Sequence, residues 1–225
     1  MTDVERCPFI QPVEFRSTDN GTRLLAAGVA MRYGAKSKPI RGSFREVFKP
    51  GAFNKTLQEA DVRAHHEHGG PYLGRTGNGT LRLVDGLSEL TYELDLPDTS
   101  AGRDAATLLE RQDIKGSSIG FRSIKAAEHW NRDVDGIALR SVGEARLFYV
   151  DLTVAPAYDD STAELALRSF AETHDLELRS VLDAVDHGTP LADLIDPPER
   201  DERSTETDDD GRETTVVRER ISWLY

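Results

Sequence analysis

Apolar and polar residues alternate along much of this chain, which is the pattern of strands that bury one face. Three places combine such strands with a turn: residues 9–32 around Asn20-Gly21, residues 81–96, and residues 122–150 around Asp135-Gly136. Asn-Gly and Asp-Gly are typical of tight hairpins. The pattern therefore predicts a mainly antiparallel β fold.

Helical spacing recurs in a few places between the strands. A short helix is predicted after Pro50, where Phe53 and Leu57 lie four residues apart. A second is predicted from Thr99 or Ser100 to about Gln112, and a third helical region from the capping pair Ser161 and Glu164 to about His187. We therefore expect a few peripheral helices around the strands.

One predicted strand, residues 147–154, carries a carboxylate in an apolar setting. Tyr149, Asp151 and Thr153 share one face of this strand, because successive side chains point to opposite sides. Asp151 is therefore either an ordinary aspartate on an exposed polar face or a functional acid.

The segment from Ile114 to Phe121, IKGSSIGF, is the most unusual stretch of the sequence. It sets Ser117 and Ser118 between two glycines and flanks them with apolar residues. Glycine inside a strand marks a bulge or a close approach by another group. The serines are either caps of a glycine-rich turn or, if a base lies within reach, a nucleophile and its neighbour.

Three histidines, His65, His66 and His68, lie in the stretch DVRAHHEH. In an extended chain His66 and His68 point to one face and His65 to the other. The stretch can supply a metal site, a single general base, or solvated loop residues. Because His129, His174 and His187 are isolated and no cluster of cysteine and histidine occurs at ligand spacing, we expect no metal.

Composition limits the classes of partner. The 225-residue chain has a net charge of −12, which argues against nucleic acid, and no apolar run reaches the length of a membrane span. Its one cysteine, Cys7, excludes an intrachain disulfide and fits a reducing compartment.

The end of the chain differs in composition from the rest. Residues 196–213 hold nine acidic and three basic residues, so this short stretch carries a net charge of −6, which is half of the net negative charge of the whole chain. We expect a disordered acidic linker there, followed by a docking peptide, VVRERISWLY, at the end. Residues 1–160 then form the main domain, residues 161–195 a helical extension, and residues 196–225 the linker and peptide.

The ordered set of motifs resembles the prohead, or capsid maturation, proteases of tailed phages. These motifs are GVAMRYG, FREVFKPGAFNKTL, DVRAHHEH with LGRTGNGTLRL, GLSELTYELDLPDT, GSSIGF, and the strand that ends in PAY, and together they span roughly residues 10–160. The resemblance implies a serine peptidase related in fold to the herpesvirus assemblins. We accordingly expect a mainly antiparallel β barrel or strongly bent sheet with a few helices.

The resemblance assigns the nucleophile and the acid to residues of this sequence by their place in the motifs. The serine directly precedes the apolar–glycine–aromatic end of its motif, which is Ser118 here, and Ser117 points to the opposite strand face. Tyr149 stands where the family's final strand commonly has an acid. Asp151, two residues and about 7 Å further along the strand, points to the same side. We hypothesise that Asp151 orients the histidine, with Glu144 as the fallback.

The resemblance implies a histidine base at His68, counted from Asp61-Val62, and Glu67 occupies the position of the family's asparagine. The sequence departs from the family where Gly69 replaces the usual acidic residue after the histidine, and the following loop is one residue shorter. His66 therefore remains an alternative.

The implied activity is cleavage of the major capsid protein's scaffolding domain, other internal prohead proteins and the protease itself. This would occur inside the prohead, in the cytoplasm of the bacterial host, without a cofactor. Whether the chain forms a homo-oligomer stays open. Two alternatives remain: a catalytically silent capsid-assembly or scaffolding protein on the same fold, and a metal-binding module built on the three histidines.

Overall fold

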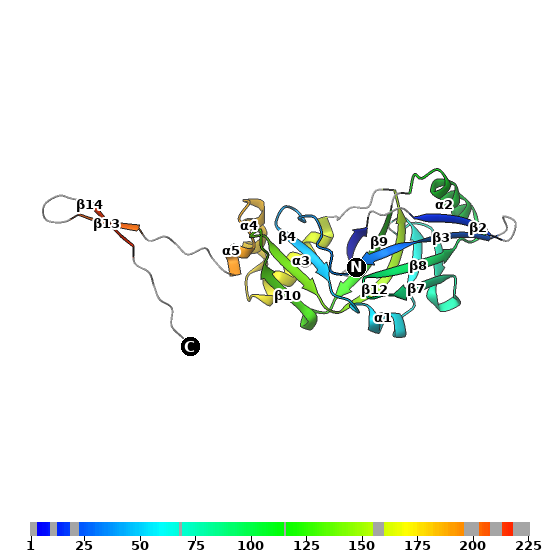
Figure 1. The fold of residues 1–225 in the computed structure, drawn as a ribbon, viewed down its shortest axis with the longest axis horizontal. Helices are drawn as coiled ribbons and strands as arrows, with labels where there is room; N and C mark the ends of the chain where they lie inside the picture. The colour runs from blue at the N-terminus through cyan, green and yellow to red at the C-terminus, as the bar shows by residue number, and fades with distance from the viewer. Residues whose placement is uncertain are drawn as a thin grey trace.

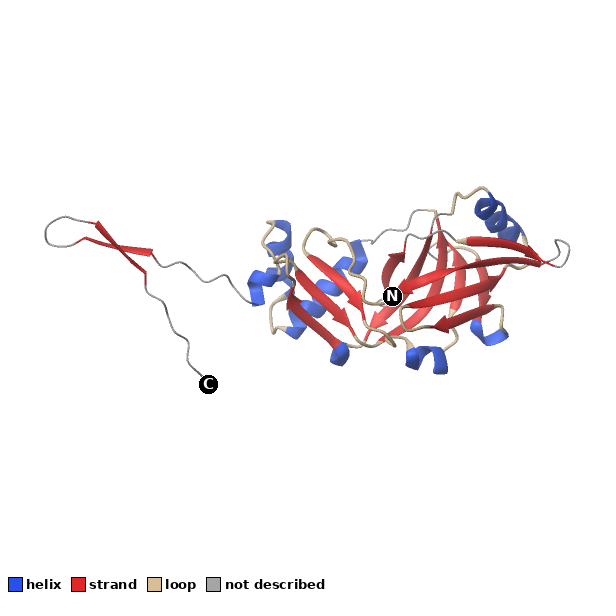
Figure 2. Cartoon of the chain, viewed as in Figure 1, coloured by secondary structure: helices blue, strands red, loops and turns tan. Residues whose placement is uncertain are grey.

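Two β-sheets pack on either side of the main hydrophobic core (Figures 1 and 2). The computed structural model describes residues 4–9, 13–18, 23–67, 69–114, 116–154, 160–195, 203–207 and 213–217. The first sheet has the order β1-β9-β12-β5-β6, with bounds Glu5–Phe9, Gly116–Ser123, Ala145–Thr153, Arg63–His66 and Tyr72–Arg75. The second has the order β2-β3-β8-β7, with bounds Glu14–Thr18, Arg23–Arg32, Glu89–Asp95 and Leu81–Asp85.

Local patterns predicted the hairpins and helices of this part well. Strands β2 and β3 pair antiparallel from Thr18 opposite Arg23, and β7 pairs with β8 in the same way. Helix α1 (Asn54–Glu59) follows Pro50, and α2 (Ser100–Glu110) begins after Thr99, whose side chain accepts a hydrogen bond from the backbone N–H of Gly102 at 3.2 Å. These predictions are confirmed because each depends on residues close together in the sequence.

The mainly β class with a few helices is confirmed, but of the two expected forms, a barrel or a strongly bent sheet, the barrel is wrong. The two sheets stay separate, and their edge strands β1, β6, β2 and β7 have no further strand partner among the described residues. A barrel requires every edge to pair. Between β6 and β7 the chain instead makes the 3₁₀ turn Thr76–Asn78 and passes through the left-handed Gly79, so β7 enters the second sheet. The first sheet is also mixed, because β12 pairs parallel with β5, whereas all pairs of the second sheet are antiparallel.

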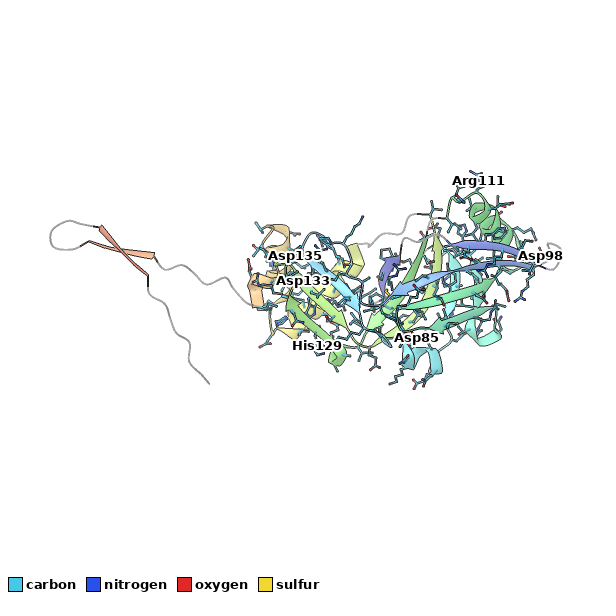
Figure 3. The ribbon with its side chains drawn as sticks, viewed as in Figure 1. Asp85, Asp98, Arg111, His129, Asp133 and Asp135 are labelled. Carbon is cyan, nitrogen blue, oxygen red and sulfur yellow. The ribbon has the colours of Figure 1, made fainter. Side chains whose placement is uncertain are left out.

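A third sheet carries a second core. It has the order β10-β11-β4, with bounds Glu128–Arg132, Ala138–Val142 and Phe44–Phe48, and β11 runs parallel to β4. Strands β10 and β11 flank the predicted turn, where Gly136 has a φ of 82°. Figure 3 shows Asp133 and Asp135 at this turn, where they pair with Lys36 and Arg45.

The helices after residue 160 pack on this third sheet. They are α3 (Asp160–Thr173), α4 (Leu178–Asp186) and the short α5 (Ala192–Ile195). Phe170 of α3 lies against Trp130 of β10 with ring centroids 5.0 Å apart. The predicted helical stretch is two helices, since Asp175 between them adopts a left-handed φ of 54°. The helical extension thus shares a core with strands of the predicted main domain.

Strand β13 (Arg203–Thr207) lies within the expected acidic linker and pairs with β14 (Glu213–Val217), which begins at the end of that linker and includes the first two residues of the expected docking peptide. The rest of residues 196–225 lies outside the described residues, so the docking peptide stays a prediction. None of the helices in the described part of the chain has the length and apolar character that crossing a bilayer demands.

Candidate active site

Four strands of the first sheet bring the candidate residues into one row. Ser118 on β9 lies opposite Pro8 on β1 and opposite Asp151 on β12, and Asp151 lies opposite His65 on β5. Residues opposed on neighbouring strands share a face of the sheet. The row therefore places a hydroxyl, a carboxylate and an imidazole side by side, with the carboxylate in the middle.

His65 is bound to the carboxylate of this row. Its Nδ1 lies 3.1 Å from Oδ1 of Asp151, which is fully buried, and its ring contacts the rings of Tyr149 and Tyr72. An ionised carboxylate only accepts hydrogen bonds, so Nδ1 donates and the neutral ring has its lone pair on Nε2. This arrangement can hold a histidine as a proton acceptor and stabilise its charged form.

The two serines lie on opposite faces of β9, as the alternation predicted. Ser118 is fully buried, and its hydroxyl donates a long hydrogen bond of 3.5 Å to the backbone carbonyl of Cys7. Ser117 points into the main core, where its hydroxyl lies 2.7 Å from that of Tyr92. Burial raises the pKa of Tyr92, so this partner is a neutral phenol. The structure therefore separates Ser117 from Asp151 and His65.

Gly120 fulfils the expectation that a glycine in this strand marks a close approach. A Cβ atom there would sit 2.0 Å from the ring of Tyr149, so only glycine leaves room for that ring. Tyr149 in turn accepts a hydrogen bond of 3.3 Å from Nε of Arg6. Tyr149, which stands where the resemblance implies an acidic residue, thus lies beside the row, over Gly120 and against the ring of His65.

His66 points away from the row. Its strand partner is Leu152, a residue of the main core, and its Nε2 is buried without a hydrogen bond to any described residue. His68, the histidine that the resemblance implies, lies outside the described residues, and its assignment stays a prediction.

Glu67 ends the strand that carries the histidines. Its φ is 60°, and its carboxylate accepts hydrogen bonds from Thr153 at 3.0 Å and from the backbone N–H of Val154 at 2.9 Å. This residue fastens the end of β5 to the end of β12. Because its left-handed backbone turns the chain, the alternation along β5 cannot be extended to His68.

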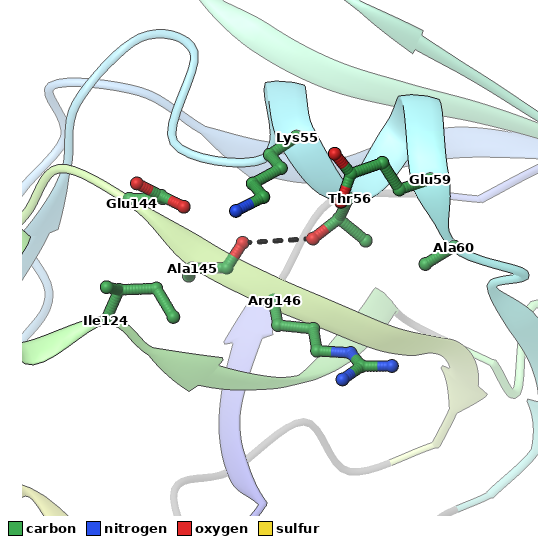
Figure 4. Close-up of a pocket in the computed structure, with 8 residues that line it drawn as sticks. All are labelled: Lys55, Thr56, Glu59, Ala60, Ile124, Glu144, Ala145 and Arg146. Atoms are coloured by element: carbon green, nitrogen blue, oxygen red, sulfur yellow. Dashed lines mark hydrogen bonds between the residues drawn. The ribbon is translucent and has the colours of Figure 1, made fainter.

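The fallback acid, Glu144, lies away from the row. It precedes β12 and is seven residues from Asp151, roughly 20 Å along the strand. It lines a separate open cavity of about 340 Å³ (Figure 4), together with Lys55, Thr56, Glu59, Ala60, Ile124, Ala145 and Arg146. Thr56 of α1 donates to the carbonyl of Ala145 there, at 3.1 Å. Within the described ranges, no three His, Cys, Asp or Glu side chains group as a metal site.

Sequence reasoning missed a buried ionic cluster, which consists of Arg140 and three glutamates. The guanidinium binds Glu5 of β1, Glu46 of β4 and Glu128 of β10, the last two at 2.9 and 2.6 Å. Arg140 itself is fully buried. Its only signal in the sequence is its position on the inward face of β11, between the buried Ala138 and Val142. The cluster joins β1, and hence the row, to the third sheet.

The cluster predicts a pH dependence of stability. Burial, opposed by Arg140 and reinforced by the neighbouring carboxylates, raises the pKa of Glu46 from 4.5 to about 7. Between these values the folded chain binds more protons than the unfolded chain, so the free energy of unfolding contributed by Glu46 falls as pH rises. We expect Glu46→Gln to remove a slope of at most about 1.4 kcal/mol per pH unit.

Urea unfolding of both proteins at several pH values across this interval measures the slope. Parallel stability curves for the two proteins would contradict the assignment. Glu59→Gln, at an exposed position of α1 outside the cluster, is the control.

Comparison with known proteins places the chain in a family. A family model described as caudovirus prohead serine protease matches residues 11–176, which include Ser118, Asp151 and His65. Among solved structures, the bacteriophage T4 capsid assembly protease is similar, with 11% identity over 68% of this chain and 98% of that chain and a TM-score of 0.46. None of the curated proteins compared with the chain matches it. Because the family model covers well over half of the sequence, the chain belongs to the caudovirus prohead serine protease family.

Proposed function

We propose that the protein is a serine endopeptidase of capsid maturation, with Ser118 as nucleophile, Asp151 as the orienting acid and His65 as the base. The row that places these three residues on one face of neighbouring strands carries this proposal. Family membership supports the class of reaction, and the geometry supports the choice of residues.

The reaction follows from the chemistry of the row. The imidazole takes the proton from the Ser118 hydroxyl as its oxygen attacks the scissile carbonyl, and the imidazolium then protonates the leaving amine. Water, deprotonated by the same histidine, clears the acyl-enzyme and restores the serine. Asp151 keeps Nδ1 protonated and stabilises the imidazolium. The α-carbons of Ser118 and His65 are two strand spacings apart, about 10 Å, so the proposed proton transfer requires the imidazole to reach across Asp151 to the serine.

The choice of His65 differs from the choice that the family pattern favours. The family pattern places the base at His68, whereas His65 is the histidine in contact with Asp151. A histidine base without an orienting acid is not held in its correct tautomer. Contact with the Asp151 carboxylate is therefore a stronger reason to choose the base than position in the family motif. His66 is the weakest of the three, since it lies on the core face.

The proposed substrates are the scaffolding domain of the major capsid protein, other internal prohead proteins and the chain itself. The proposed place of action is the assembling prohead, in the cytoplasm of the bacterial host. The acidic stretch after residue 196 is a proposed site of self-cleavage. The name of the similar T4 protein, a capsid assembly protease, agrees with this role.

A catalytically silent assembly protein is the second candidate. The observation in its favour is the complete burial of Ser118, with its hydroxyl bound to a backbone carbonyl rather than to an imidazole. Co-expression with the major capsid protein of the same phage, followed by intact-mass measurement of both proteins, tests the two candidates. Truncated capsid protein supports the protease, and an intact one supports the silent protein.

The acid and base are tested by separate substitutions in the same assay. We expect His65→Gln to lower the rate by about 10⁶-fold and Asp151→Asn by about 10⁴-fold, because the asparagine stabilises the wrong tautomer. His68→Gln is the matched control and is expected to retain cleavage. Full activity of His65→Gln with loss of activity in His68→Gln would move the base to His68 and leave the proposed reaction standing.

A further inference from the structure

Two arginines lie directly opposite each other on the outer face of the first sheet. Arg122 of β9 is the strand partner of Arg146 of β12, and both are exposed. The intervening residues Ile119 and Phe121 of β9 belong to the main core. Because side chains alternate along a strand, Arg122 therefore shares the outer face with Ser118.

The two guanidinium groups of this arginine pair converge on one aromatic ring. The ring of Phe148, the extra residue at the bulge of β12, lies 5.8 Å from the guanidinium carbon of Arg122 and 5.4 Å from that of Arg146. One cation over an aromatic ring is a stabilising contact, but like charges directly opposed on neighbouring strands repel each other. Among the described residues Arg146 forms no ion pair that would offset this repulsion. A carboxylate bound between the two guanidinium groups would offset it.

The arginine pair lies near the row of candidate residues. Arg122 is four residues from Ser118, which is about 13 Å along β9. Between them on the same face lies Tyr149, with Arg6 and Arg63 on the strands to either side. Positive charge thus extends from the arginine pair toward the row, on a chain whose net charge is −12.

A side chain has room to enter beside the arginine pair. Arg146 borders the open cavity of about 340 Å³, which Lys55, Glu59 and Glu144 also line. Figure 4 shows the guanidinium of Arg146 pointing away from Glu144, and neither of these two glutamates forms an ion pair with it. The cavity therefore leaves the positive charge of Arg146 available to a carboxylate from outside.

We propose that Arg122 and Arg146 form a subsite for an acidic side chain of the substrate, and that the segment it selects is the acidic stretch 196–213 of this chain. An extended peptide advances about 3.3 Å per residue, so the bound acidic residue lies about four residues from the scissile bond. This inference rests on the proposed function, and it names the chemistry by which the site recognises its own chain.

The charge of the stretch complements that of the subsite. Residues 196–213 carry nine acidic and three basic residues, and Asp208, Asp209 and Asp210 follow one another. Opposite charges across an interface select the partner and speed the encounter, while like charges exclude other partners. With 18 residues, the stretch is long enough to place one residue at the subsite and another at Ser118.

A charge exchange between two full-length chains tests the proposal. The substrate is the Ser118→Ala chain, and the enzyme is either the unaltered chain or the double variant Arg122→Glu with Arg146→Glu. Intact masses follow cuts within residues 196–213 of the substrate. We expect the double variant to cut about tenfold more slowly or worse, because two attractive ion pairs become repulsive.

Restoring the charge complementarity from the other side separates recognition from damage to the fold. A Ser118→Ala substrate that also carries Asp208→Lys, Asp209→Lys and Asp210→Lys is expected to be cut about tenfold faster by the double variant than the substrate with the unaltered stretch. A double variant that was merely damaged would show no such preference. Arg179→Glu, at an exposed position of α4, is the control enzyme and is expected to cut the unaltered stretch at the normal rate.

A milder variant covers the case in which the charge-reversed enzyme does not fold. Arg122→Gln with Arg146→Gln removes the charges and keeps polar side chains, and circular dichroism verifies its fold. Added salt is expected to slow cutting of the stretch by the unaltered enzyme and to change the rate of this variant much less, because salt screens exposed charges.

The outcomes separate this inference from the proposed function. Three results would overturn the subsite while the protease stands: equal rates for the unaltered enzyme and both folded arginine variants, no gain from the three lysines with a folded charge-reversed enzyme, or cleavage of the major capsid protein without any cut in residues 196–213. Absence of cleavage of both the capsid protein and the Ser118→Ala chain by the unaltered enzyme overturns the proposed protease, and the inference with it.

Discussion

Replacing Ser118 by alanine is expected to leave the major capsid protein at full length, where the unaltered chain truncates it. The alanine removes the hydroxyl that the proposed row offers for attack on the scissile carbonyl. Loss of a nucleophile of this kind lowers the turnover rate by about 10⁶-fold, which is indistinguishable from no cleavage in a co-expression assay. Intact masses of both proteins measure the result.

Ser117→Ala is the matched control, since it deletes the same atom one residue away. It breaks the hydrogen bond to Tyr92 and costs about 1–3 kcal/mol of stability, because a buried hydroxyl loses its partner. Cleavage itself is expected to persist. If the capsid protein is still truncated with Ser118→Ala but not with Ser117→Ala, Ser117 is the nucleophile. If it is truncated with both variants, the serine mechanism is refuted.

Arg140→Leu is expected to have the largest effect on stability. The substitution leaves the carboxylates of Glu5, Glu46 and Glu128 together inside the protein without their cation. Burial opposes the charge of Arg140, but the three carboxylates outweigh it and raise the pKa of the guanidinium. Removing one member of a buried ionic group costs about 3–5 kcal/mol, a large share of the stability of an ordinary domain.

Urea unfolding followed by circular dichroism measures this loss as a lower midpoint. Arg103→Leu provides the control, because Arg103 pairs with Asp98 at the surface and such a pair contributes at most about 1 kcal/mol. An unfolding midpoint of the Arg140→Leu protein close to that of the Arg103→Leu protein would contradict the prediction that the ion pairs of Arg140 stabilise the fold.

Much of the fold could be read from the sequence because its cause is local. The hairpin from β2 to β3 and helices α1 and α2 depend on turn residues, caps and apolar spacing within about ten residues. The opposite orientation of Ser117 and Ser118 follows from strand alternation alone. The glycine at position 120 signalled a close approach, although the ring that approaches, Tyr149, belongs to a strand nearly thirty residues later.

The choice of histidine could not be read in the same way. Counting along the family motif favours His68, yet the contact with Asp151 depends on the parallel register of β5 against β12. That register joins residues 86 positions apart, and the left-handed Glu67 ends the alternation just before His68. A shift by one residue in a strand exchanges its faces, so the partner strand decides which histidine meets the acid.

The sequence by itself therefore indicated the β2–β3, β7–β8 and β10–β11 hairpins, helices α1 and α2, and the family, and it suggested the serine and acid that the proposal uses. The tertiary structure alone decided that the two main sheets stay open, that His65 meets Asp151, that Arg140 gathers three glutamates, and that β1 lies along β9. Each of these depends on contacts between distant segments, and the local residue pattern shows which face of a strand is buried but not which segment packs against it.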